Sequence, residues 1–407
     1  MNLYFVIIVT FLFLSIIISL TSEMLNLSSL GKPIPSNLKD LYDSEEYEKS
    51  QNYTKSKTRL KITKDITSFS FLLAIIYFEG FATLFEISQI SGNESLNALC
   101  FLGLFMVLSE VVEIPFSIYS TFMIESKFGF NKTSVKTYVL DKIKSYLLTS
   151  ILGGIFFLAI VKFFNLYQDK AWIVGSGFGI LLSITLLYIA PKFILPIFNK
   201  FTPLEDEELK SKLLAVAKKA NFDIEDIFVI DGSRRSTKAN AFFSGFGKNK
   251  RIGLYDTLVE KYSADEICAI LAHEIGHHKK KHIIKSFALQ FLYIVLLLWM
   301  TNQFIFEIEL YRAFGINEIS TYVGILLTSL LLTPMSILID PIKTYFSRKN
   351  EYEADRFAVN IMESSESLIQ GLMKLNKDNL TNLTPHPIYV ALNYSHPPLD
   401  NRIKSLG

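Results

Sequence analysis

Cysteine is scarce in this chain of 407 residues, which contains two, Cys100 in an apolar stretch and Cys268. Two cysteines make neither a disulfide framework nor a cysteine-based metal site. The chain also has no large excess of charge of one sign, because 41 Lys and Arg against 39 Asp and Glu leave a formal net charge of +2. Nothing in this balance indicates a nucleic-acid partner. Internal repeats and low-complexity segments are absent, which argues against a repeat architecture.

Apolar residues, by contrast, are abundant. They make up 50% of the chain, aromatic residues reach 14%, and the mean hydropathy is +0.31. These values are typical of a membrane protein rather than of a soluble domain of this length. A spanning helix needs ~20 mostly apolar residues. Seven runs come close, at residues 3–21, 66–88, 97–123, 146–166, 171–193, 286–306 and 319–340.

The loops between these runs differ in basic charge. Segment 23–65 carries eight Lys and Arg and segment 124–145 carries five, whereas segments 89–96, 167–170 and 307–318 carry at most one. Because basic loops stay on the cytosolic side, the N-terminus is predicted to lie outside. The first run lacks a basic flank and a small-residue cleavage site, so we interpret it as a retained anchor rather than a signal peptide.

The predicted fold class is therefore a multi-span α-helical membrane protein with seven transmembrane helices. Residues 1–193 are expected to hold five of these helices with cytosolic loops, and residues 286–340 the other two. Residues 194–285 then form an α+β segment on the cytosolic side. Residues 341–407 reach the same side and are expected to complete one domain with it.

Acidic residues fall within the predicted membrane helices, at Glu79, Glu86, Glu110 and Glu113. An ionised carboxylate in lipid is expensive, so such residues face a protein interior or a water-filled space. Two interpretations stay open from the residues alone: polar contacts between helices, or an aqueous cavity inside the bundle. A transporter would carry the same acids.

The most informative motif is the run of residues 273–277, His-Glu-Ile-Gly-His. Ser263, followed by acidic residues, predicts the start of a helix that contains this run. Histidines four apart on a helix share a face, so His273 and His277 can bind one metal ion. Imidazole nitrogens suit a catalytic Zn²⁺, and Glu274 can reach the metal-bound water.

A catalytic zinc normally has a third protein ligand. Glu351 and Asp355 lie four apart on a second predicted helix and share a face, whereas Glu353 points elsewhere. We take Glu351 as the ligand and Asp355 as a carboxylate that orients a liganding histidine. His278 and His282 are interpreted as residues on the helix surface.

The segment before the metal motif has an α+β pattern. Residues 205–220 form an amphipathic helix and residues 227–230 a strand. Residues 240–246 and 251–255 then predict a hairpin, with its turn at 248–250. An edge strand beside the metal helix can bind an extended peptide through main-chain hydrogen bonds.

Asn240, Ala241 and Phe242 are the candidate substrate-binding edge of this hairpin. A purely structural hairpin is the alternative.

These features together resemble the integral-membrane zinc metalloproteases called CAAX prenyl protease 1. The resemblance covers nearly the whole chain, and it is specific because many short segments occur in the same order along seven predicted spans. The segments are residues 33–55, 128–132, 198–204, 240–242, 273–277, 351–355 and 395–399, with Arg402.

The resemblance implies a barrel of seven helices around a large water-filled chamber, which favours the cavity for the buried acids. A HExxH zinc domain of the gluzincin type would face inward from the cytosolic side. His273, His277 and Glu351 correspond to ligands of one Zn²⁺ per chain, and Glu274 to the general base.

The other matching positions have supporting roles in such a protease. Asn240 and His396 correspond to residues that hold the substrate backbone or stabilise the oxyanion. Asp355 and Arg402 correspond to a supporting pair behind the metal. We therefore expect a zinc endopeptidase that cleaves near the C-terminus of prenylated CAAX-type proteins, with zinc-bound water attacking the peptide carbonyl.

Two other functions remain open at this level. One is a broader-specificity quality-control metalloprotease, similar to the membrane heat-shock proteases, and the other is a transporter or receptor with a structural zinc. The expected partners are a prenylated peptide or protein and membrane lipid, without nucleic acid. A monomer in a bacterial plasma membrane is favoured over one in the endoplasmic reticulum, with the zinc site on the cytosolic side.

Overall fold

The computed structural model describes residues 2–39, 41–244 and 251–407, and helices dominate them. The helices of the N-terminal half are α1 Leu3–Ser28, α2 Ser44–Tyr77, α3 Gly80–Ser88, α4 Glu94–Ile118, α5 Val135–Tyr167 and α6 Ala171–Ile189. Those that follow are α7 Leu195–Phe198, α8 Glu207–Lys219, α9 Asp256–Lys261, α10 Ala264–Lys279, α11 His282–Phe304, α12 Ile308–Arg312, α13 Thr321–Leu331, α14 Thr333–Met362, α15 Glu366–Asp378, α16 Pro387–Asn393 and α17 Leu399–Leu406.

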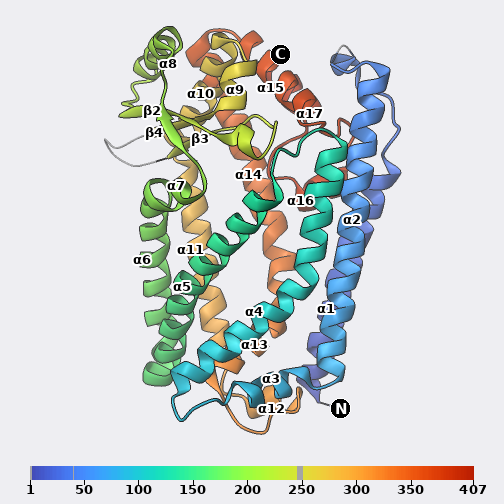
Figure 1. Ribbon diagram of the computed structural model, residues 1–407, viewed down its shortest axis with the longest axis vertical. Coiled ribbons are helices and arrows are strands. Elements are labelled where there is room, and N and C mark those ends of the chain that lie inside the picture. Colours follow the sequence, from blue (N-terminus) through green and yellow to red (C-terminus); the bar gives the residue numbers. More distant parts are fainter. Residues whose placement is uncertain (1, 40, 245–250) are drawn as a thin grey trace.

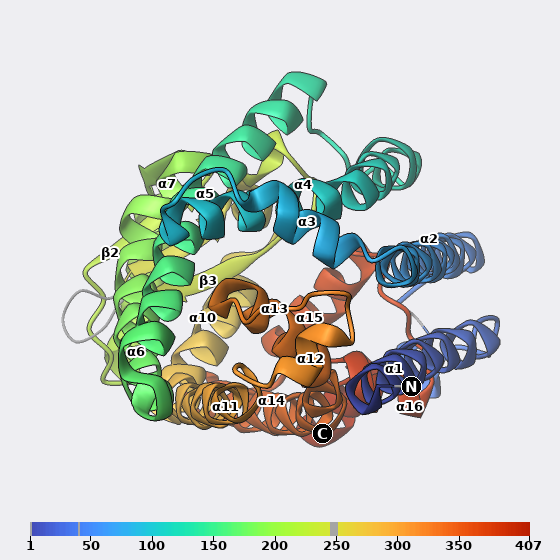
Figure 2. The ribbon, with the colours of Figure 1, turned by 90° about the horizontal axis from the view of Figure 1, so that it is seen from below.

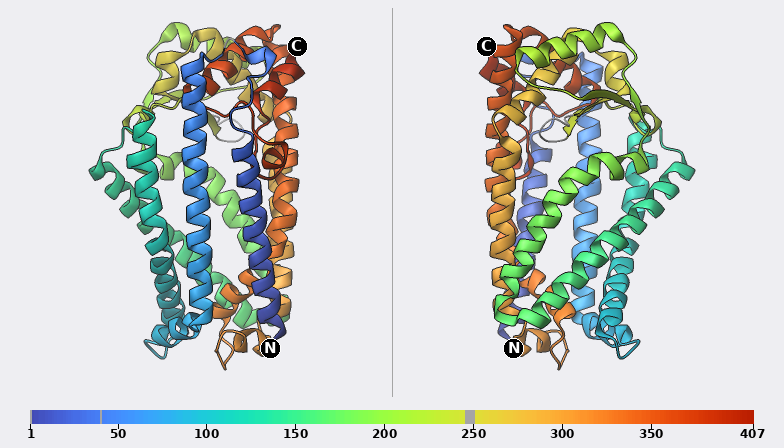
Figure 3. Two further views of the ribbon diagram at one scale, coloured as in Figure 1. Left: turned by 90° about the vertical axis from the view of Figure 1, so that its right-hand side faces the viewer. Right: turned by 90° about the vertical axis from the view of Figure 1, so that its left-hand side faces the viewer.

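The long helices run along the length of the molecule (Figure 1). The N-terminus lies at the bottom end with α3 and α12, and the C-terminus lies at the top end with α8, α10 and α15. Seen from below, α1, α2, α4, α5, α6, α11 and α14 are arranged around α12 and α13 (Figure 2). The side views show the same tall wall of helices beneath a smaller cap of helices and strands (Figure 3).

Several helices are long and apolar enough to cross a membrane. Within the described ranges, four helical segments qualify alone: Leu3–Ser28, Glu94–Glu125, Val135–Phe198 and His282–Phe304. Two pairs, α2 with α3 and α13 with α14, qualify only together and are bent, so that up to six segments qualify by length and composition. The chain is therefore a multi-span helical membrane protein, as predicted.

The helical segment Val135–Phe198 has 64 residues. It is not one continuous straight helix, because the chain reverses its direction within it. The Phe156 ring of α5 stacks on the Phe178 ring of α6, with centroids 6.1 Å apart. In a straight helix these positions would be about 33 Å apart, at a rise of about 1.5 Å per residue. The chain turns at Gln168, whose φ is +43°, and α5 and α6 lie side by side (Figures 1 and 2).

The second predicted run, 66–88, is bent rather than straight. Helices α2 and α3 meet at 71°. Glu79 ends α2 with a left-handed φ of +52°, a conformation that the regular helix cannot contain. Glu79 and Glu86 are exposed and belong to the bottom end of the molecule with α3 (Figure 1).

The last predicted run, 319–340, is also broken, with 58° between α13 and α14. Pro334 lies in the first turn of α14. Its ring removes one N–H donor and clashes with the turn before it, which favours a kink or a break at this position. The second part continues far beyond the predicted run and carries the acidic cluster of residues 351–355.

Glu110 and Glu113 contact neighbouring helices. The Tyr146 hydroxyl donates to Glu110 at 2.5 Å, and Lys64 Nζ lies 2.5 Å from a carboxylate oxygen of Glu113. Glu113 also lines a cavity of about 530 Å³ between α1, α2 and α4. Polar contacts between helices therefore hold both acids, and one of them also borders a cavity.

A small sheet lies beside the helical cap. Its strands are β1 Phe201–Pro203, β2 Asp226–Ile230, β3 Ala241–Ser244 and β4 Arg251–Tyr255, in the order β1-β2-β4-β3. β3 pairs with β4 in antiparallel register, Ala241 opposite Leu254, which confirms the predicted hairpin. The turn predicted at 248–250 lies outside the described residues.

One hydrophobic core joins the cap to the metal-motif helix. Its buried members include Leu213 of α8, Leu254 of β4 and Ile275 of α10, and Phe357 of α14 packs against them. The segments 194–285 and 341–407 therefore contribute to the same core. Burial of this apolar surface fixes α10 against α14.

Candidate metal centre

Helix α10 begins where its capping residues predict. The Ser263 hydroxyl accepts from the backbone N–H of Glu266 at 3.3 Å, and the Glu266 carboxylate accepts from the backbone N–H of Ser263 at 2.8 Å. This capping box satisfies two backbone donors at the helix end. The helix continues to Lys279, so His273 and His277 share one face, as predicted.

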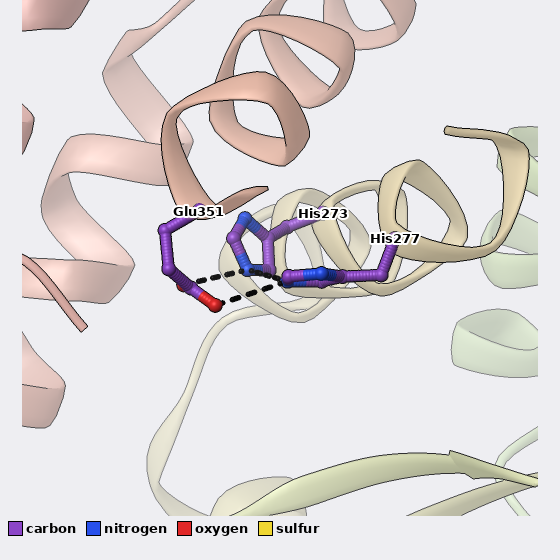
Figure 4. A group of neighbouring side chains, drawn as sticks. All are labelled: His273, His277 and Glu351. Carbon is purple, nitrogen blue, oxygen red and sulfur yellow. Dashed lines mark hydrogen bonds and ion pairs between the residues drawn. The ribbon is translucent and has the colours of Figure 1, made fainter. Parts of the chain in front are cut away.

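His273, His277 and Glu351 converge (Figure 4). The Nε2 atoms of the two histidines are 3.0 Å apart. The Glu351 oxygens lie 3.4 Å from Nε2 of His273 and 3.3 Å from Nε2 of His277. One ligand atom from each side chain falls within 4.8 Å of the others, and within the described ranges no other group of metal-binding side chains does so.

The site favours a positive charge between these side chains. Burial opposes the ionised form of Glu351, but its contacts with His273 and His277 hold the pKa of the carboxyl well below its usual range. Burial lowers the pKa of His273, and hydrogen bonds with Asp355 and Glu351 outweigh this and raise it to about 9. Oε2 of Glu351 is buried without a hydrogen-bond donor. Two imidazole nitrogens and a carboxylate thus fit a divalent metal ion.

Asp355 and Arg402 lie directly behind the cluster. Asp355 is fully buried, and one of its oxygens lies 2.8 Å from Nδ1 of His273. Arg402 donates to both Asp355 oxygens, at 2.8 and 2.5 Å. An imidazole whose Nδ1–H faces a carboxylate presents Nε2 as an unprotonated ligand. The structure therefore brings the predicted supporting pair to the predicted place.

His282 lies elsewhere than predicted, whereas Glu353 points away from Glu351 and Asp355, as predicted. His282 is buried, with 3% of its surface exposed, and is not a surface residue. Its Nδ1 is 3.0 Å from Nδ1 of His277, and its Nε2 is 3.1 Å from Oε2 of Glu353. The sequence interpretation missed this contact because His282 begins α11, and the turn at Lys281 folds it back against α10.

Glu274 and His396 face the same cavity as the cluster. A cavity of about 590 Å³ is lined by Glu274, His277, Glu351 and His396, among others. Nε2 of His396 lies 3.4 Å from a Glu351 oxygen, and its side chain is 64% exposed. The predicted base and the predicted oxyanion donor therefore border one space that a substrate can enter.

Cys268 lies on the metal helix but outside the cluster. It is 3% exposed, and burial raises the pKa of its thiol to about 11. A neutral thiol is neither a metal ligand nor a nucleophile.

The predicted substrate-binding segment is the edge of the sheet. β3 begins at Ala241, and among the described residues its strand partner is β4. It contacts α10. Asn240 is exposed, and Phe242 is half-buried. In the part of the chain that the structure describes, β3 is thus an edge strand beside the metal helix, the arrangement that strand addition requires.

Gly276 sets the distance between α10 and α14, the helices that carry the two histidines and Glu351. A Cβ at this position would lie 3.0 Å from the backbone oxygen of Ala354 and 3.1 Å from its Cα. A glycine between the two histidines therefore lets α14 pack closely on α10, and a larger residue here would push the Ala354 backbone away.

We expect Gly276→Val to force the two helices apart and to lower the metal content of the purified protein. Overpacking of this kind costs roughly 1–3 kcal/mol, so the melting temperature should fall as well. Gly103→Val is the matched control, because Gly103 has open space around it. A Gly276→Val protein with full metal content would contradict this account of the helix contact.

Comparison with known proteins gives two family matches. The model described as CAAX prenyl protease N-terminal, five membrane helices, matches residues 23–200. The model of peptidase family M48 matches residues 203–407. Together they cover most of the chain.

Similar proteins extend over nearly the full length. CAAX prenyl protease 1 of Saccharomyces cerevisiae is 35% identical over 92% of this chain and 88% of its own. The homologue of Arabidopsis thaliana is 34% identical, with 94% and 93% covered. The crystal structure of S. mikatae Ste24p has a TM-score of 0.94 and 33% identity and covers 99% of both chains.

These relatives come from eukaryotes, so they do not support the expected bacterial membrane. The matches in sequence and in structure agree with each other, and both contain the predicted metal motif within the matched residues. The chain therefore belongs to peptidase family M48 and, within it, to the CAAX prenyl protease 1 family of membrane metalloproteases.

Proposed function

We propose that this protein is a zinc-dependent membrane endopeptidase that cleaves near the C-terminus of prenylated CAAX-type proteins. The observation that carries the proposal is the convergence of His273, His277 and Glu351 within 4.8 Å beside a cavity that Glu274 lines. The names of the relatives, CAAX prenyl protease 1, support the substrate class.

Three side chains would hold the metal: His273 and His277 through Nε2, and Glu351 through its carboxylate. Zinc is the metal that accepts this donor set in hydrolases. When bound, Zn²⁺ supplies Lewis acidity and lowers the pKa of a coordinated water toward ~7.

Glu274 is the general base. It follows the first liganding histidine and borders the cavity, so its carboxylate can accept a proton from the attacking water. The same carboxyl then returns the proton to the leaving amine. Proton transfer by a positioned side chain contributes typically about 10²–10⁴-fold to the rate.

His396 stabilises the oxyanion of the peptide carbonyl. Its Nδ1 lies 3.0 Å from the Ser395 hydroxyl. When that hydroxyl donates to Nδ1, Nε2 carries the proton and can donate to the oxyanion. Losing one donor of this kind costs about 10²–10³ in rate. Asn240 to Phe242 would hold the substrate as an added strand along β3.

An apolar cavity supports a prenylated substrate. It measures about 980 Å³ and lies between α6 and α11. Leu187, Ile283 and Phe287 line both this cavity and the one at the metal cluster. A prenyl chain can be buried there while the peptide next to it lies at the catalytic residues.

Cleavage of a farnesylated CAAX peptide should exceed cleavage of the same peptide without the prenyl group. Burial of a prenyl chain contributes about 0.8 kcal/mol per CH₂ group, so kcat/KM should differ by at least about tenfold. Mass spectrometry of the products measures both rates and the position of the cut. Equal cleavage of both peptides would favour a quality-control protease of broader specificity.

We also propose that seven segments cross the membrane around a chamber. The reversal at Gln168 divides Val135–Phe198 into two antiparallel spans, and each bent pair adds one. Few residues are buried in the apolar 18-residue windows of two spanning helices, 0% in that of His282–Phe304 and 6% in that of Glu94–Glu125, which supports a hollow centre rather than a packed bundle. Glu113 would face the water inside this chamber.

The basic segment 23–65 supports an orientation with the metal cluster on the cytosolic side and the N-terminus on the other. Residues 1–193 and 286–340 would then form the membrane part, with five and two spans. Residues 194–285 and 341–407 would form one protease domain in contact with membrane lipid. We expect the protein to act as a monomer.

A further inference from the structure

We propose that His282 and Glu353 are positioning residues that fix the ring and the tautomer of His277. The inference rests on the proposed metal site and goes beyond it, because it assigns a role to two side chains outside the ligand set. The contacts form a line: Glu353 Oε2 to His282 Nε2 at 3.1 Å, and His282 Nδ1 to His277 Nδ1 at 3.0 Å.

The positions of the protons along this line can be derived from Glu353, the residue at its end. A carboxylate oxygen accepts hydrogen bonds, and Oε2 of Glu353 also accepts one from Lys285 Nζ at 3.4 Å. His282 therefore donates from Nε2, and its Nδ1 is left to accept. His277 then donates from Nδ1, and its Nε2 keeps an unprotonated lone pair directed at the cluster.

The other liganding histidine has an equivalent support. His273 Nδ1 lies 2.8 Å from Asp355, and Arg402 holds that carboxylate. Nδ1 of His273 thus contacts a carboxylate directly, and Nδ1 of His277 is connected to a carboxylate through His282. Such partners set ligand orientation and basicity.

The fold explains how one helix, α14, supplies both the ligand Glu351 and the carboxylate of Glu353 that contacts His282. Glu351 and Glu353 are two positions apart on α14, so their side chains point in directions about 200° apart. Helix α14 contacts α10 and also α11. Glu351 reaches the ligands on α10, while Glu353 reaches His282 at the start of α11. Lys281, with φ +57°, makes the turn that brings His282 to His277.

The test is zinc affinity, measured by chelator competition on the purified full-length protein. Replacing a partner of a metal ligand costs about 10–100-fold in metal affinity, and we expect a loss in this range for His282→Leu. His282→Asn keeps a hydrogen-bond acceptor near the Nδ1 position, so it should recover much of the loss. Glu353→Gln keeps an acceptor but loses the charge and should show a smaller loss.

Glu363→Gln is the matched control at the end of the same helix, because Glu363 follows the last residue of α14 and pairs with Lys219 rather than with the cluster. Its zinc affinity should equal that of the wild type. If His282→Leu does not fold, the difference between Glu353→Gln and Glu363→Gln decides the question. The visible spectrum of the Co²⁺-loaded proteins gives a second readout, which should change in His282→Leu and return toward wild type in His282→Asn.

Wild-type affinity in both His282→Leu and Glu353→Gln would overturn the inference. Equal losses in His282→Leu and His282→Asn would also overturn it, because packing rather than the acceptor would then be responsible. A wild-type protein that binds no zinc would instead refute the proposed metal site, so the two failures are distinguishable.

Discussion

Glu274→Gln should abolish peptidase activity while the protein keeps its metal. The substitution changes no ligand and little volume, so the cluster of His273, His277 and Glu351 stays intact. In the proposed mechanism it removes the carboxylate that accepts the proton of the attacking water and returns it to the leaving amine. We expect kcat to fall by at least about 10²-fold, the lower range for general acid–base catalysis.

Two measurements on the same preparation check this result. Elemental analysis gives metal per chain, which should equal that of the wild type, and cleavage of a farnesylated peptide gives kcat and KM. Because Glu274 acts on the reacting atoms, KM should change much less than kcat. Activity within tenfold of the wild type would refute the role of Glu274 as base.

His273→Ala should lose both metal and activity. The substitution removes one of three protein ligands and leaves Asp355, buried at 0% exposure, paired only with Arg402. We expect metal content to fall from about one ion per chain toward zero. Removing one partner of a buried charged network also destabilises a protein, commonly by about 3–5 kcal/mol, so the melting temperature should fall.

His386→Ala is the control for this prediction. His386 is a half-buried histidine that caps α16 by accepting from the backbone N–H of Ile388 and has no part in the cluster. Its metal content should be that of the wild type. Full metal content in His273→Ala would contradict the assignment of His273 as a ligand.

Local spacing was sufficient to predict the core of the site. The two histidines four apart define a helix face, and Ser263 defines its start, so the beginning of α10 could be predicted but not its end at Lys279. The spacing of Glu351 and Asp355 likewise placed both on one side of α14. These are properties of single helices, which depend on sequence neighbours alone.

Features that depend on contacts between helices could not be predicted in the same way. The burial of His282 follows from a left-handed residue at Lys281 and from the position of Glu353 on another helix. The role of Gly276 follows from its close contact with the backbone of Ala354 on another helix. Neither contact leaves a pattern in the surrounding residues.

The membrane runs illustrate the same limit. Hydropathy located the apolar segments, but not the bends at Glu79 and before Pro334. Pro334 was a local signal that the run 319–340 could break, since proline kinks or breaks a helix. Glu79 gave no comparable signal, because glutamate rarely adopts the left-handed conformation.

Anomalous diffraction at the zinc absorption edge tests the central claim most directly. Crystals of the wild-type protein should show one strong peak between Nε2 of His273, Nε2 of His277 and the Glu351 carboxylate. Its distances should be about 2.0–2.1 Å to nitrogen and about 2.0–2.2 Å to oxygen. A peak bound by other side chains, or fully active crystals without a peak there, would contradict it.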